Sequence, residues 1–130
     1  MFKQTITSAG DRPVVLMDSI SSVGEDEVGS IVVSASHGGI SSGEFATRHR
    51  LGACFFNDAG VGKEQAGIAA LVMLDDIDVA GATLSHDTAR IGDARDHWEH
   101  GVVSHVNRTA SASGVAPGQP VQDAVARLSG

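Results

Sequence analysis

Four short apolar segments constrain the fold of this chain more than any other feature of its sequence. They are PVVLMDS (13–19), GSIVVSAS (29–36), LGACFFND (51–58) and VAGATLSHD (79–87). None alternates strictly between apolar and polar residues, as a strand with one face in water would. Near-continuous apolar runs of this length are typical of strands covered on both faces. We therefore expect a buried open sheet of about four mainly parallel strands.

Segments with helical character lie between these strands and after the last one. The expected helices span residues 41–50, 63–76, 94–110 and 120–128. The third follows Asp93, a residue suited to an N-cap, and carries Trp98, Val102 and Val106 at helical spacing. The predicted fold class is α/β, a small three-layer open sheet with helices on both faces. The link 20–29 is close to the lower length limit for a helical crossover.

The chain has the length of one ordinary domain. Residues 1–113 are expected to form a single α/β domain, because a run of Ser, Gly, Ala and Pro follows. Residues 114–130 are then a linker and a short C-terminal helix, packing on the same domain or on a neighbouring subunit. Helix 63–76 is apolar or glycine all round between residues 66 and 74, so it needs cover besides the sheet. Another element of the chain or another subunit can supply that cover, and we expect a homo-oligomer formed through this helix.

Charge and composition argue against several classes of partner. Sixteen acidic and nine basic residues give a formal charge of −7, which repels nucleic acid and anionic membranes. Four Phe, one Trp and no Tyr offer no stacking platform for single strands. No apolar run approaches the roughly 20 residues that cross a bilayer, and no signal-peptide pattern opens the sequence, so a cytoplasmic location is expected. The single cysteine, Cys54, is expected to be a buried thiol.

Each expected strand ends on polar residues. In an open parallel sheet the carboxyl ends of the strands share one edge, where loops and helix N-termini form ligand sites. Two of the polar residues are histidines, which exchange protons near neutral pH. The residues expected at this edge are Asp18-Ser19, Ser36-His37-Gly38-Gly39, Asn57-Asp58-Ala59-Gly60 and Ser85-His86-Asp87.

Roles can be assigned to these residues by chemistry. The candidate catalytic residues are His37, Asp58, His86 and Asp87, with the histidines as acid or base and the carboxylates as orienting groups. The candidate ligand-binding residues are Ser36, Gly38, Gly39, Asn57, Gly60 and Arg90, the last as a clamp for a carboxylate or phosphate. Structural alternatives stand beside them: caps and turns for Asn57 and Asp58, and a salt bridge to Asp87 or Asp93 for Arg90.

Two familiar motifs do not fit. The stretch FNDAGVGKEQAG (56–67) suggests a phosphate-binding P-loop, but Asn57 stands at the first glycine position and Glu64 at the hydroxyl position. His97 and His100 lack the spacing of a zinc protease and are expected on the solvated surface, whereas His105 is expected in the core near Trp98.

The strand-end histidines and carboxylates are ligand types for a mixed nitrogen and oxygen metal site, yet a metal-free site is favoured. The sequence identifies no cofactor.

Two classes of function remain open. The first is an enzyme that binds an anionic carboxylate or acyl compound at the strand ends and acts as a hydrolase or lyase. The second is a module that holds a ligand without transforming it, or an oligomeric assembly protein. Loss of turnover without His37 or His86 would indicate the first class, and a change of oligomeric state on altering Leu71 or Met73 would indicate assembly.

A third reading rests on the segment IVVSASHGGISSGEFA (31–46). Around Ser36, His37 and Gly38 it resembles the strand-end histidine region of mannose-type phosphotransferase proteins. The resemblance implies a phosphohistidine carrier in which His37 accepts a phosphoryl group. The chain departs from that family in topology, because the strand PVVLMD already precedes the histidine strand.

Overall fold

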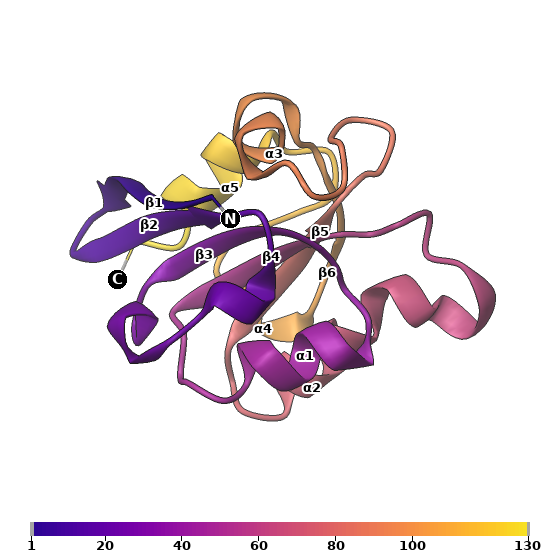
Figure 1. Cartoon of the computed structure of the whole chain (residues 1–130), viewed down its shortest axis with the longest axis horizontal. Helices are drawn as coiled ribbons and strands as arrows, with labels where there is room; N and C mark the ends of the chain where they lie inside the picture. Colours follow the sequence, from indigo (N-terminus) through magenta and orange to yellow (C-terminus); the bar gives the residue numbers. More distant parts are fainter. Residues whose placement is uncertain (1, 130) are drawn as a thin grey trace.

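The computed structural model describes residues 2–129 and contains one six-stranded sheet (Figure 1). Its strands follow one another in space in the order β1-β2-β3-β4-β5-β6. The pairs from β2 to β5 are parallel, while β1 and β6 run antiparallel to their neighbours. The strands are β1 (Lys3–Ala9), β2 (Arg12–Met17), β3 (Ile31–His37), β4 (Ala53–Asn57), β5 (Ala80–Leu84) and β6 (Val103–Val106).

The expected α/β class with a mainly parallel sheet is confirmed, but the expected number of four strands is wrong. The four apolar segments of the sequence are β2 to β5. The additional strands β1 and β6 form the two edges of the sheet. Strand β1 was not predicted, because its sequence, KQTITSA, is mostly polar and mostly exposed. It pairs with β2 through a turn in which Gly10 has φ +59°.

The helices are shorter than expected. They are α1 (Ile40–Ala46), α2 (Ala69–Asp75), α3 (Ala94–His100), α4 (Arg108–Ala112) and α5 (Val121–Ala126), with 3-10 turns η1 (Ile20–Ser22), η2 (Glu25–Glu27) and η3 (Lys63–Ile68). The link 20–29 therefore crosses by two 3-10 turns. Only residues 69–75 of the expected helix 63–76 are α-helical, because Glu64 and Gln65 have φ of 57° and 59°.

The expected helix 94–110 is also wrong. Helix α3 ends at His100, where Gly101 is extended with ψ 136°, and β6 then begins at Val103. Gly101 lies so close to its surroundings that an added Cβ would clash with the His97 carbonyl oxygen and stand 2.7 Å from a Leu84 methyl. The Val-rich segment after it pairs with β5 instead of continuing the helix, since its β-branched residues fit a pleated surface.

Strand side chains alternate between two hydrophobic clusters. Val14, Leu16 and Phe55 belong to the first, which we call the α3-side cluster because α3 contributes Ala94 and α5 contributes Val125. Val15, Met17 and Phe56 belong to the second, the α2-side cluster, which contains Leu71 and Leu74 of α2 and Ala46 of α1. Figure 1 shows α3 and α5 on one side of the sheet and α1 and α2 on the other. Burial of both strand faces explains why β2 to β5 are almost wholly apolar.

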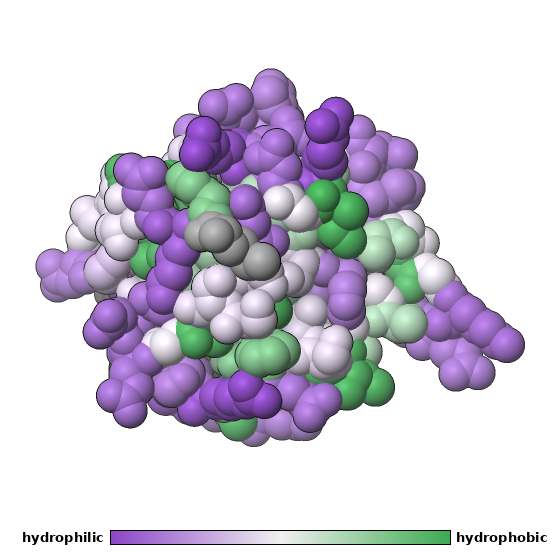
Figure 2. Space-filling view, in the orientation of Figure 1, coloured by the Kyte–Doolittle hydropathy of each residue, from purple (hydrophilic) through white to green (hydrophobic). Residues whose placement is uncertain are grey.

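The surface is predominantly hydrophilic, with hydrophobic residues in small separate patches on the face that Figure 2 shows. The segment that projects at the right of Figures 1 and 2 contains η3, and it is hydrophilic at its tip. Within residues 2–129, no helix combines the length and the apolar character needed to cross a membrane.

Asn107 joins three parts of the fold through one buried amide. Its Oδ1 accepts hydrogen bonds from the backbone amides of Gly81 (3.0 Å) in β5 and Ala110 (2.8 Å) in α4. Its Nδ2 donates to the carbonyl oxygens of Leu71 (3.2 Å) in α2 and Val79 (3.0 Å) before β5. The side chain therefore caps α4 and fixes α2 against the sheet at the same time.

Replacing Asn107 with Ala should lower the free energy of unfolding by about 3 kcal/mol or more. The change removes a helix cap, worth about 1 kcal/mol, and leaves several buried polar groups unpaired at about 1–3 kcal/mol each. Urea unfolding measures the loss. Arg108→Ala, which truncates a side chain 91% exposed in the same turn, is the control and should change stability by less than about 0.5 kcal/mol. Equal stability of N107A and the parent would show that these hydrogen bonds do not anchor α2.

Candidate functional site

The carboxyl ends of β2 to β5 lie side by side at one edge of the sheet. His37 at the end of β3 pairs with Asn57 at the end of β4, which in turn pairs with Leu84 at the end of β5. Neighbouring strands are about 4.8 Å apart, so the ends of β2 and β5 are separated by about 14 Å. One small ligand cannot contact both Asp18 and His86, and the edge must be considered in parts.

The loop after β5 closes this edge on the side of α3. It runs across three strand ends in turn: the Ala89 carbonyl accepts from Asn57 Nδ2 (3.0 Å), Gly92 donates to the Ala35 carbonyl (2.9 Å), and Ala94 donates to Asp18 Oδ1 (2.9 Å). The loop after β4 turns the other way, toward α2. Loops that diverge to opposite faces leave a crevice between the strands they follow, which is where open α/β sheets bind ligands.

A pocket of about 430 Å³ opens on the α2 side of this edge. The end of β3 and the start of α1 form one wall, and the loop after β4 forms the other. The lining residues are His37, Gly39 and Ile40 from the first wall and Ala59, Val61, Gly62, Ala66 and Gly67 from the second. The pocket is therefore mostly apolar, and His37 is its one ionisable lining group.

His37 is held in a defined orientation at the mouth of this pocket. The Gly39 amide donates to Nδ1 (3.0 Å), so in the neutral ring the proton lies on Nε2. The two glycines that follow leave room for this arrangement. A Cβ on Gly39 would stand 2.8 Å from Nδ1, and one on Gly38 would stand 2.5 Å from the Gly67 carbonyl oxygen.

The loop after β4 has an unusual left-handed course. Ala59, Gly60, Val61 and Gly62 have φ of 51°, 74°, 66° and 74°, a region that Val adopts rarely because of its branched Cβ. Hydrogen bonds to Asp58 hold this loop, from the Gly60 amide to Oδ1 (2.8 Å) and from the Val61 amide to the backbone carbonyl (2.6 Å). The Gly60 amide is thus engaged by Asp58 and does not face the pocket unpaired.

Asp58 also binds the histidine that follows β5. Its Oδ1 accepts from the His86 backbone amide (3.1 Å) and from Nδ1 of the His86 ring (3.1 Å). The Asp58 side chain is 6% exposed and that of His86 51% exposed. Burial alone would raise the pKa of Asp58, but hydrogen bonds from the Gly60 amide, the Ser104 hydroxyl and His86 together hold this pKa below its usual value. Asp58 therefore remains a carboxylate and orients the imidazole of His86.

Asp87 extends this pair toward solvent. Its Oδ1 lies 3.3 Å from His86 Nε2, and its side chain is 81% exposed. Both nitrogens of His86 thus lie near carboxylate oxygens, one buried and one exposed. Gly60 is next to the same ring, since a Cβ there would lie 3.6 Å from its Cε1. The structure therefore brings together Asp58, Gly60, His86 and Asp87, directly behind the pocket wall, while His37 and Gly39 line the pocket itself.

Asn57 points away from this pocket, into a buried polar network. Its Nδ2 donates to Nε2 of His97 (3.2 Å), and His97 Nδ1 donates to the Asp93 carbonyl (2.7 Å). The expected surface position of His97 is wrong, because the residue is fully buried. Helix α3 lies on the sheet in an orientation that its sequence alone does not specify, and it turns His97 inward and leaves His100 exposed beside Asp96 (3.0 Å).

Ser36, Arg90 and His105, which the sequence analysis also singled out, do not line the pocket at His37. The Ser36 hydroxyl accepts from the Ile20 amide (3.0 Å) and so holds η1. The Arg90 side chain is exposed, and its guanidinium forms no ion pair with any residue between 2 and 129. His105 lies in β6, not in a helix beside Trp98, and its ring contacts Thr83 Oγ1 (3.3 Å).

Sequence reasoning did not identify Ser104, which hydrogen-bonds the Asp58 carboxylate and Thr83 Oγ1. No local pattern indicates this role of Ser104, because the sequence predicts a helix here and the contact joins residues far apart in the chain.

Among the described residues, no three His, Cys, Asp or Glu side chains are grouped so that they could hold a metal ion. Comparisons of the chain with protein-family models, curated proteins and solved structures gave no significant match.

The buried His97 should make stability depend on pH. Burial lowers the pKa of His97, against the opposing effects of the Asp93 carbonyl and of the charges on Asp96, Asp93 and Asp18. Below about pH 6.5 the unfolded chain binds a proton at His97 that the folded chain excludes. The free energy of unfolding should therefore fall as the pH drops below about 6.5, by up to about 1.4 kcal/mol per pH unit.

Urea unfolding of the parent and of His97→Gln across pH 5 to 8 measures this effect. The variant has no titrating group at this position, so its stability should fall less on acidification. Parallel curves for the two proteins would show that His97 does not carry the pH dependence.

Proposed function

We propose that this protein binds a small anionic molecule in the pocket beside His37, at the carboxyl ends of its strands. The observation that carries the proposal is the placement of an oriented imidazole in the wall of an otherwise apolar pocket. A few polar groups in a mostly apolar concavity are typical of small-molecule sites. We infer a three-layer domain, in which helices cover both faces of the sheet and the pocket lies at the strand-end edge between them.

The chemistry of the lining favours a carboxylate or acyl compound. The His37 ring can donate a hydrogen bond from Nε2, because Nδ1 accepts from the Gly39 amide. The apolar remainder of the pocket, which includes Ile40 and Val61, suits a short hydrocarbon body. Phosphoryl transfer to His37, the carrier function, is a lesser alternative, because the free lone pair of the neutral ring lies on Nδ1, to which the Gly39 amide donates.

Acid–base catalysis in this pocket follows if the bound molecule is transformed. His37 is the group in the pocket wall that can give a proton, from Nε2, while Asp58 and His86 hold the loop that forms the opposite wall. Hydrolysis needs such a donor within hydrogen-bond reach of the leaving group, and proton abstraction beside a carbonyl needs Nε2 in its unprotonated form. If turnover occurs, loss of the His37 imidazole should lower kcat by about 10²- to 10⁴-fold.

Binding can be tested with a set of small monocarboxylates, acetate to hexanoate, and with inorganic phosphate. A compound that binds only the folded protein stabilises it by about 1.4 kcal/mol at ten times its dissociation constant. At least one should raise the melting temperature of the parent and shift the His37 Cε1–H resonance. The thermal shift should disappear in His37→Ala and persist in His100→Ala, which alters an exposed histidine on α3.

Two results would oppose this proposal. One is a set of compounds none of which moves the His37 resonance at millimolar concentration. The other is a thermal shift of equal size in the parent and in His37→Ala, because that ligand would be bound elsewhere.

A second candidate function, self-assembly, rests on a different surface. Val72 on α2 and Ile40 at the start of α1 are 66% and 65% exposed, although both are large apolar residues. They border a groove of about 700 Å³ between α2 and the edge strand β6, which also contains Leu71 and Val106. A second copy of the chain that covers this groove would bury these side chains, as the apolar character of α2 in the sequence suggests.

Val72→Glu tests this candidate. If copies associate through α2, a charge at this position should lower the molar mass measured by light scattering after size exclusion from that of an oligomer to that of one chain. Val28→Glu is the matched control, since Val28 is 56% exposed and lies in the link between β2 and β3. A parent protein that is already a single chain at high concentration would contradict this candidate.

A further inference from the structure

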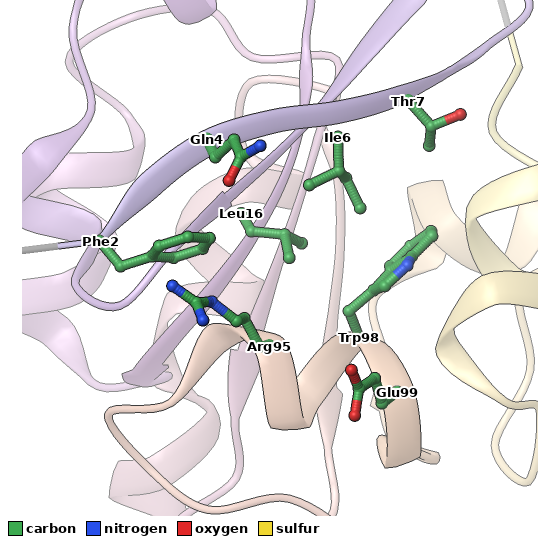
Figure 3. A pocket seen from close by; sticks show the side chains of 8 residues that line it. All are labelled: Phe2, Gln4, Ile6, Thr7, Leu16, Arg95, Trp98 and Glu99. Carbon is green, nitrogen blue, oxygen red and sulfur yellow. The ribbon is translucent and has the colours of Figure 1, made fainter.

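A second hollow, separate from the pocket at His37, lies between the edge strand β1 and helix α3 (Figure 3). Its volume is about 440 Å³, and it shares no lining residue with the strand-end pocket. Leu16 of β2 and Ile6 of β1 lie between its two ends. Because it is formed on the α3 side of the sheet, the loops that shape the strand-end pocket do not contribute to it.

Two aromatic side chains face each other across this hollow. Figure 3 shows Phe2 at one end and Trp98 at the other, with Leu16 and Ile6 between them. Leu16 is 2% exposed and belongs to the α3-side cluster, on which Phe2, Ile6 and Trp98 pack as partly buried residues. A flat or branched hydrocarbon group would contact apolar surface on three sides here, and aromatic walls stabilise such groups by stacking.

One cationic group, the guanidinium of Arg95, lies at the Phe2 end of the hollow (Figure 3). The Arg95 guanidinium lies over the Phe2 ring, 4.2 Å from its centre. It forms no ion pair with a carboxylate of residues 2–129, even though Glu99 follows one helical turn later. In Figure 3 Gln4 lies on the same side of the hollow as Phe2 and Arg95. Glu99 lies below Trp98 in Figure 3, away from Leu16 and Ile6.

Acidic side chains near the hollow oppose multiply charged anions most strongly. An adjoining hollow that also includes Phe2 and Arg95 is lined by Asp18, Asp93, Asp96 and Glu99, and Glu99 lines both hollows. These carboxylates repel phosphates and dicarboxylates, whereas one guanidinium fork matches one carboxylate in a bidentate manner. A neutral ligand would leave the Arg95 fork unused.

We propose that this hollow binds a small monocarboxylate with an aromatic or branched apolar body. The apolar body lies between Phe2 and Trp98 over Leu16 and Ile6, and the carboxylate accepts hydrogen bonds from the Arg95 guanidinium. This is a second binding site, and it does not depend on the function proposed for the pocket at His37.

The chain supplies its own reporter, because Trp98 is its one tryptophan. We would titrate the full chain with phenylacetate and with phenylacetamide, its neutral isostere, and record tryptophan emission. Phenylacetate should produce a saturable change in emission, with a dissociation constant about tenfold or more below that of phenylacetamide, because the charge-assisted hydrogen bonds to Arg95 are lost with the amide.

Variants of the arginine separate the charge from the apolar contacts. Arg95→Gln should remove the preference, giving phenylacetate and phenylacetamide similar dissociation constants. Arg95→Lys keeps the charge without the planar fork and should retain part of the preference. Thermal unfolding of each variant verifies that it is folded. His37→Ala and Arg90→Gln should leave the titration unchanged, so failure of the strand-end proposal would not affect this result.

Three outcomes would overturn the inference. They are an emission change that stays linear with phenylacetate concentration, equal affinities for the acid and the amide in the parent, and an unaltered preference in folded Arg95→Gln. The last would place the carboxylate at another cation.

Discussion

The carboxylate of Asp58 is the interaction on which the organisation of the strand-end edge depends. It lies at the end of β4, it is almost fully buried, and its Oδ1 accepts hydrogen bonds from Gly60 and from both the backbone and the ring of His86. Through these bonds one side chain joins the loop that forms the pocket wall to the loop that follows β5. A third partner, Ser104, connects it to the edge strand β6.

The direction of the loops explains why the pocket at His37 opens on the α2 side of this edge. The loop after β5 crosses the ends of β4, β3 and β2 before α3 begins, in contact with Asn57, Ala35 and Asp18. The loop after β4 turns toward α2, and the segment 66–67 that follows it packs closely on the two glycines after His37. The hollow at Arg95 arises for a different reason, because the short polar strand β1 extends the sheet beyond the part that α3 covers.

Burial made part of this fold predictable from sequence. The segments that became β2 to β5 are apolar on both faces because clusters containing Leu74 and Val125 pack against them, and that requirement appears directly in their residues. Strand β1 has no such requirement, since six of its seven residues are not buried. The spacing of Trp98, Val102 and Val106 fits a helix equally well, and only the close packing around Gly101 and the pairing with β5 exclude it.

Part of the strand-end site could also be predicted from the sequence. Parallel strands must end at one edge, so His37, Asp58 and His86 could be assigned to it in advance. Which of them touch could not be predicted, because the contact of Asp58 with His86 depends on the left-handed loop at Ala59 to Gly62. The inward position of His97 likewise depends on how α3 lies on the sheet.

Amide hydrogen exchange in Asp58→Ala, compared with the parent, tests the central role of this carboxylate most directly. The account predicts that the amides of Gly60 and His86, which both donate to Asp58, exchange about 10- to 100-fold faster in the variant, while those in the middle of β3, β4 and β5 are unchanged. Unaltered exchange at Gly60 and His86 would contradict the account, since the edge would then be held together without Asp58.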